Sequence, residues 1–110
     1  MYKISIDIKA GNKIAAQFQS KEIEGEEPAL RFTDKWKAEC QTIENMLSYI
    51  EKVFWYQKGT LLDILEGDNL KAYKAFQKKV TTTIPKIKSI QEFTIKIDCD
   101  GDVYKNTFKF

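Results

Sequence analysis

Residues 93–110, FTIKIDCDGDVYKNTFKF, alternate apolar and polar side chains on both sides of the Asp100-Gly101 pair. Alternation with a period of two is typical of a β-strand with one buried face, and Asp-Gly is a strong signal for a two-residue hairpin turn. Such a turn sets Ile97 opposite Tyr104, so the apolar faces of the two strands coincide. This segment therefore predicts an antiparallel hairpin at the C-terminal end.

A second hairpin is predicted at the N-terminal end of the chain. Apolar side chains alternate through residues 2–10 and again through residues 13–23. A three-residue loop, residues 10–12, sets Ile8 opposite Ile14 and brings both apolar faces together, whereas a two-residue loop separates them. We therefore expect the three-residue loop and the pairing of Ile8 with Ile14.

The middle of the chain begins with the spacing of a long amphipathic helix. We expect it to start after a cap at Thr33 or Asp34 and to end at Gly59. Its apolar arc covers about 200°, more than the stripe on an ordinary surface helix, so two covers are needed. The sheet is one cover, and the other is a second helix or another chain. The arc consists of Trp36, Cys40, Ile43, Met46, Leu47, Tyr49, Ile50, Val53, Phe54 and Tyr56.

Two further helices are expected before the C-terminal hairpin. Thr60 and Asp63 resemble a capping box at the start of a short helix, which Gly67 ends. Asp68 or Asn69 then caps a longer helix, which the β-branched residues Thr81–Thr83 and Pro85 end. The apolar stripe of this helix is formed by Leu70, Tyr73, Phe76 and Val80.

The order of these elements, β-β-α-α-α-β-β, defines the expected fold. Its simplest assembly is a two-layer α+β fold, in which two terminal hairpins form a four-stranded antiparallel sheet with helices on one face. The length of 110 residues suits a single domain, residues 1–110. No stretch approaches the roughly 20 apolar residues that span a bilayer, and no signal peptide is recognisable. We therefore expect a cytoplasmic protein that does not enter the membrane.

The residue inventory excludes several kinds of catalytic and metal site. The chain has no histidine, so His-dependent nucleophile triads and the commonest metal ligand are absent. Its cysteines, Cys40 and Cys99, do not suffice for an ordinary structural zinc site. The acidic run from Asp98 to Asp102 lacks the glycine and glutamate positions of a calcium-binding loop and is interpreted as a hairpin turn. We predict no enzyme, no cofactor and no metal site.

The third helix carries one of two candidate binding surfaces. Six lysines and no acid occur between Asn69 and Gln91, and three of the lysines lie within about 60° on the helix. The functional interpretation is contact with phosphates or with an acidic protein surface, and the alternative is a solvated helix face. Only one of the 18 basic residues is an arginine, which weighs against base reading. The lysines are Lys71, Lys74, Lys78, Lys79, Lys86 and Lys88.

The other candidate surface is centred on Trp55. On a helical wheel Trp55 lies away from the main apolar arc, and an exposed tryptophan is a plausible hot spot for protein binding. The alternative is that Trp55 packs under the turn at Gly59 or against the short helix. The predicted protein-binding residues are Trp55, Tyr56, Tyr49 and Met46.

These observations favour a small non-enzymatic protein-binding domain of the accessory, inhibitor or immunity type. It would act through a face of the long helix, on a protein partner or on a second copy of itself. The alternative is a nucleic-acid-associated protein that contacts phosphates through the lysine-rich helix without reading sequence.

Overall fold

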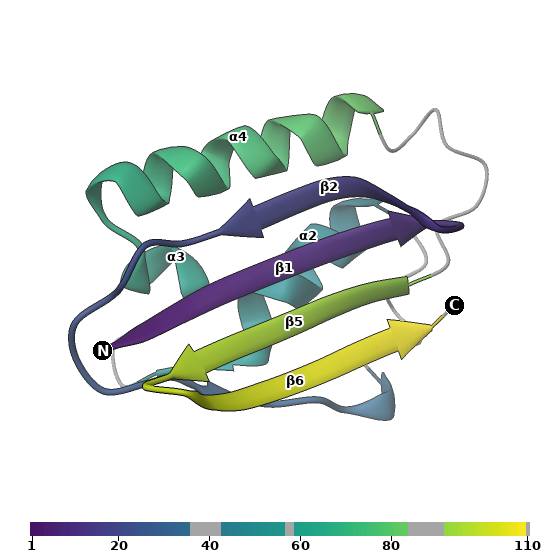
Figure 1. Ribbon diagram of the computed structural model, residues 1–110. Helices are drawn as coiled ribbons and strands as arrows, with labels where there is room; N and C mark the ends of the chain where they lie inside the picture. Colours follow the sequence, from purple (N-terminus) through teal and green to yellow (C-terminus); the bar gives the residue numbers. More distant parts are fainter. Residues whose placement is uncertain (36–42, 57–58, 84–91, 110) are drawn as a thin grey trace.

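The structure is a computed structural model that describes residues 1–35, 43–56, 59–83 and 92–109 (Figure 1). Its main sheet is antiparallel, has the strand order β2-β1-β5-β6, and carries the helices on one face. The strands of this sheet are β1 (Tyr2–Ala10), β2 (Lys13–Gln19), β5 (Glu92–Cys99) and β6 (Asp102–Lys109). The helices are α2 (Ile43–Val53), α3 (Leu61–Ile64) and α4 (Gly67–Thr83). The predicted α+β class and four-stranded antiparallel sheet are confirmed.

The C-terminal hairpin has the predicted turn and register. Ile97 pairs with Tyr104, and the turn residues Asp100 and Gly101 have φ angles of 52° and 96°. Two positive φ angles in a two-residue turn match the right-handed twist of the flanking strands, and Asp-Gly adopts them readily. The amide of Gly101 also donates to Oδ1 of Asp98 at 3.1 Å.

The N-terminal hairpin has a register that differs from the predicted one. Ile8 pairs with Ala16 instead of Ile14, and the loop has two residues instead of three. A β-bulge after Ile8 absorbs one residue and so keeps Ala16 and Phe18 on the buried face. Ile14 lies opposite Lys9 and is 50% exposed. The predicted pairing was therefore wrong because alternation alone does not reveal an extra residue in one strand.

The core lies between the sheet and the helices and is rich in aromatic contacts. The ring of Phe18 on β2 meets Tyr73 on α4 edge-on, with 5.3 Å between the ring centroids. Tyr49 on α2 meets Phe93 on β5 in the same way at 5.8 Å. The predicted inward stripe of α4 is confirmed, since Tyr73, Phe76 and Val80 are all buried.

The long helix ends earlier than the sequence predicts. Helix α2 stops at Val53, and the next two residues form a short strand, β4 (Phe54–Trp55). This strand pairs with β3 (Ala29–Leu30), and the amide of Arg31 donates to the carbonyl of Val53 at 2.8 Å. Aromatic and β-branched residues favour extended backbone. The pairing with β3 gives hydrogen-bond partners to backbone N–H and C=O groups that would otherwise be paired inside a longer helix.

Several other predictions concern the ends of elements. The carboxylate of Asp63 accepts from the amide of Thr60 at 2.8 Å, as expected for the predicted capping box of α3. Trp36, Cys40 and Pro85 lie outside the described residues.

No helix in the described part of the chain combines the length and the apolar composition needed to cross a membrane.

Candidate functional site

Two of the predicted protein-binding residues belong to the core of the protein. Met46 and Tyr49 are only 3% and 4% exposed. Helix α2 is in contact with α3 and α4 as well as with the sheet side of the molecule, so the chain itself supplies the second cover that the wide apolar arc requires. Met46 and Tyr49 therefore do not form part of a docking surface in this structure.

Trp55 is exposed, although it lies on a strand instead of a helix. Its side chain is 51% exposed, and the guanidinium carbon of Arg31 lies 4.2 Å from the centroid of its ring. This cation–π contact restrains both side chains at the surface. Within the described residues no carboxylate forms an ion pair with Arg31, so the guanidinium keeps N–H donors available for another molecule.

A hollow of about 350 Å³ lies against β3 and is lined mostly by apolar residues, together with Glu27. Ala29, which pairs with Trp55 across the β3–β4 ribbon, lines the hollow. Tyr104 on the edge strand β6 lines it as well and is 54% exposed. The other lining residues are Glu27, Pro28, Leu30 and Ile97. We call Arg31, Trp55, Tyr104 and this hollow the aromatic surface.

Sequence reasoning did not identify Arg31 and Tyr104 as members of this surface. Both depend on the pairing of β3 with β4, which places a segment from the first third of the chain beside Trp55. A two-residue strand has too little periodicity to be predicted. The sequence contained one indication that Arg31 has a special role, since it is the only arginine of the chain.

The predicted lysine-rich face exists on α4. Lys71, Lys74, Lys78 and Lys79 are exposed, and they form no ion pair with any described residue. Helix α4 lies along the edge strand β2, so its outer side faces solvent (Figure 1). We call these four residues the lysine surface. The remaining predicted members, Lys86 and Lys88, lie outside the described residues.

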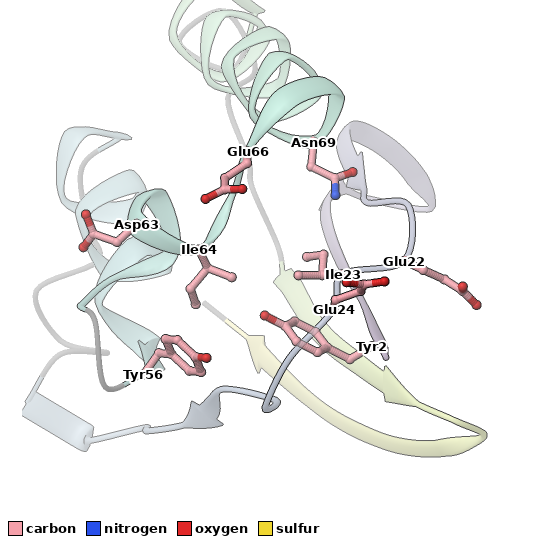
Figure 2. A pocket seen from close by; sticks show the side chains of 9 residues that line it. All are labelled: Tyr2, Glu22, Ile23, Glu24, Tyr56, Asp63, Ile64, Glu66 and Asn69. Carbon is pink, nitrogen blue, oxygen red and sulfur yellow. The ribbon is translucent and has the colours of Figure 1, made fainter.

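Tyr56, the last predicted protein-binding residue, lines a different hollow of about 280 Å³. Figure 2 shows the hydroxyl groups of Tyr56 and Tyr2 pointing toward one another across it. Ile23 and Ile64 supply apolar walls, and no basic residue lines the hollow within the described part of the chain. The acidic lining residues are Glu22, Glu24, Asp63 and Glu66. We call this site the acidic hollow.

Neither a metal site nor a reactive thiol is found in the described part of the chain. There, no three acidic or cysteine side chains are grouped so that they could hold a metal ion. Cys99 is a free thiol. Partial burial raises the pKa of Cys99, and the neighbouring carboxylate of Glu27 raises it further. A raised pKa keeps the thiol protonated and poorly nucleophilic at neutral pH.

Comparison with models of protein families, with curated proteins and with solved structures finds no match for this chain. Function therefore has to be inferred from the aromatic surface, the lysine surface and the acidic hollow themselves. The aromatic surface brings together Trp, Tyr and Arg, the three residue types most characteristic of protein-binding hot spots and interfaces.

Proposed function

We propose that the protein is a non-enzymatic protein-binding domain that contacts its partner through the aromatic surface. The observation that carries this proposal is the half-exposed ring of Trp55 held against the guanidinium of Arg31. An exposed indole offers a large apolar area whose burial is favourable. Because the ring is already restrained, little side-chain entropy is lost when it is buried by a partner.

The chemistry of the aromatic surface indicates the chemistry of the partner. The hollow beside Ala29, the strand partner of Trp55, accommodates one large apolar side chain, and the N–H donors of Arg31 suit a carboxylate next to that side chain. We therefore expect a partner segment that places an aromatic or aliphatic residue beside Asp or Glu. The accessory, inhibitor and immunity classes and the cytoplasmic location expected from the sequence stay predictions.

Peptide selection tests this proposal without a known partner. A random peptide library is selected on the immobilised protein and counter-selected on Trp55→Ala. We expect enriched peptides that combine a large apolar residue with an acidic one. Trp55→Ala should weaken their binding about 30-fold, since truncating a hot-spot residue costs about 2 kcal/mol. Binding is measured by calorimetry.

Ile14→Ala is the matched control for this experiment. Ile14 is as exposed as Trp55 but lies on β2, at the edge of the main sheet opposite β6, so its loss should leave peptide affinity unchanged. Peptides that bind wild type and Trp55→Ala equally well would contradict the proposal. A dimer that dissociates in Trp55→Ala, measured by light scattering, would identify a second copy of the chain as the occupant.

A second candidate function is contact with nucleic-acid phosphates through the lysine surface. The four exposed ammonium groups on one helix, which form no ion pair within the described residues, favour it. Changing Lys71, Lys74 and Lys78 together to Glu should then abolish binding to a labelled single-stranded oligonucleotide, and binding to wild type should weaken steeply with salt. Fluorescence anisotropy provides the measurement.

The control is a second triple variant with the same change of charge. Lys3, Lys105 and Lys109 are exposed on the strands, and their change to Glu lowers the net charge equally. Equal losses in both variants, or no binding by wild type at low salt, would remove this candidate function.

A further inference from the structure

We propose that the acidic hollow is a binding site for an alkylammonium or alkylguanidinium group, carried either by a small organic cation or by a basic side chain of another protein. The site is distinct from the aromatic surface. It lies where the start of β1, the segment after β2, the residue after β4 and the α3–α4 connection meet (Figure 2).

The first observation is the buried side chain of Tyr2, whose hydroxyl reaches the hollow. The residue is only 2% exposed, and its backbone is fixed by hydrogen bonds of 3.0 and 2.8 Å to Ile23. Figure 2 shows its hydroxyl directed into the hollow, and no described residue forms a hydrogen bond with that hydroxyl. The hydroxyl is therefore available to pair with a hydrogen-bond donor of a ligand that enters the hollow.

The protonation state of Tyr2 determines what the hydroxyl can bind. Burial raises the pKa of Tyr2 to about 12, with a smaller contribution from the neighbouring Tyr56. The phenol is therefore neutral at physiological pH, and its oxygen can accept a hydrogen bond from a cationic N–H group.

The second observation is the charge around the hollow. Asp63 already accepts from Thr60, and Figure 2 shows Glu22 directed away from the hollow. Glu24 and Glu66 remain, and neither forms an ion pair with a described residue. Two carboxylates without a basic partner favour a positively charged occupant.

The size and the walls of the hollow limit the kind of cation. A volume of about 280 Å³ lies at the lower end of the range for ligand pockets, so the hollow accommodates a group of side-chain size. Ile23 and Ile64 provide apolar contacts for methylene groups. Metal ions fit poorly, because the described acidic residues form no group that could coordinate one. The walls therefore favour an organic cation with an alkyl stem.

The test titrates the full chain with n-butylammonium and, separately, with n-butylguanidinium. Binding is monitored by the NMR chemical shifts of the protein. We expect saturable shifts of Tyr2, Ile23, Tyr56 and Ile64 with at least one probe. n-Butanol, which has the same stem without the charge, should bind about tenfold more weakly or not at all. Equal binding of n-butanol, or no saturable shift with either cation at equal ionic strength, would overturn the proposal.

Three variants localise the binding. Tyr2→Phe and the double variant Glu24→Gln/Glu66→Gln should each weaken the cation about tenfold. Glu26→Gln is the matched control, because Glu26 is exposed in the same segment and does not line the hollow. Circular dichroism confirms that each variant is folded. Unchanged affinity in folded Tyr2→Phe and in the folded double variant would overturn the proposal.

Two short peptides, one with a single lysine and one with a single arginine, distinguish the sources of the cation. Affinity above that of the free probes indicates a protein partner, and equal affinity indicates a small cation. Trp55→Ala should leave the binding of n-butylammonium unchanged. An experiment that disproves cation binding in the acidic hollow therefore leaves the proposed function untouched, and the reverse also holds.

Discussion

The phenol of Tyr2 holds its proton more tightly in the folded protein than in the unfolded chain. Burial raises its pKa from the ordinary value of 10.0 to about 12, because the phenolate would be poorly solvated. A raised folded-state pKa means that this contribution to stability is complete below pH 10. It is lost as the pH rises from about 10 to about 12.

The pH dependence of unfolding in Tyr2→Phe tests this property. The free energy of unfolding of wild type should fall above pH 10, by about 1.4 kcal/mol per pH unit for each such phenol. The free energy of unfolding of Tyr2→Phe should fall less over the same pH range. The curves of the two proteins should differ by about 2 kcal/mol near pH 12. Tyr73, whose pKa is raised by burial and by Glu51, is present in both proteins and cancels. Parallel curves from urea unfolding between pH 8 and 12 would show that Tyr2 is solvated.

At the scale of elements, Gly59 precedes α3 and adjoins the acidic hollow. Gly59 forms a backbone bridge with Tyr56 of the acidic hollow, and its φ angle is +128°. A Cβ at Gly59 would overlap the carboxylate of Asp63, which caps α3. The position therefore requires glycine for its backbone conformation and for the space beside the cap.

Gly59→Ala should destabilise the protein by about 2 kcal/mol or more, through backbone strain and loss of the cap. Gly11→Ala is the control, since Gly11 also has a positive φ angle but open space around its Cβ position. Its cost should be limited to the backbone strain, about 1 kcal/mol. Equal thermal shifts for the two variants, measured by calorimetry, would exclude a role of the Asp63 cap.

The elements differ in how well sequence could predict them. The C-terminal hairpin was predicted correctly because its turn and its alternation are local properties of residues 93–110. The bulge after Ile8 and the end of α2 at Val53 were missed. The bulge was missed because alternation does not reveal an extra residue in one strand. The end of α2 was missed because the short strand β4 pairs with β3, which lies far away in the sequence.

At the scale of the whole molecule, burial decides which predicted residues can bind another molecule. The wide apolar arc of α2 correctly indicated a second cover, but sequence alone did not show whether another chain would provide it. The structure buries Met46 and Tyr49 in the protein's own core and leaves Trp55 exposed. Trp55 and Tyr56, predicted as one surface, reach different sites because neighbouring residues of an extended chain point to opposite sides.

The three surfaces occupy different parts of the molecule. The aromatic surface combines the β3–β4 ribbon with β6, the lysine surface lies on α4, and the acidic hollow adjoins the start of β1. A bound partner should therefore perturb one set of residues and leave the others unchanged, so mapping the contact by residue separates the proposed functions.

Two-dimensional NMR of the protein, titrated with the peptide selected on wild type, provides that map. Protein binding through the aromatic surface predicts that the indole N–H of Trp55 and the amides of Ala29, Arg31 and Tyr104 shift together and saturate at one equivalent. The resonances of Lys71, Lys74 and Lys78 should stay in place. An unchanged Trp55 indole, with shifts confined to α4 or to the acidic hollow, would contradict the proposed function.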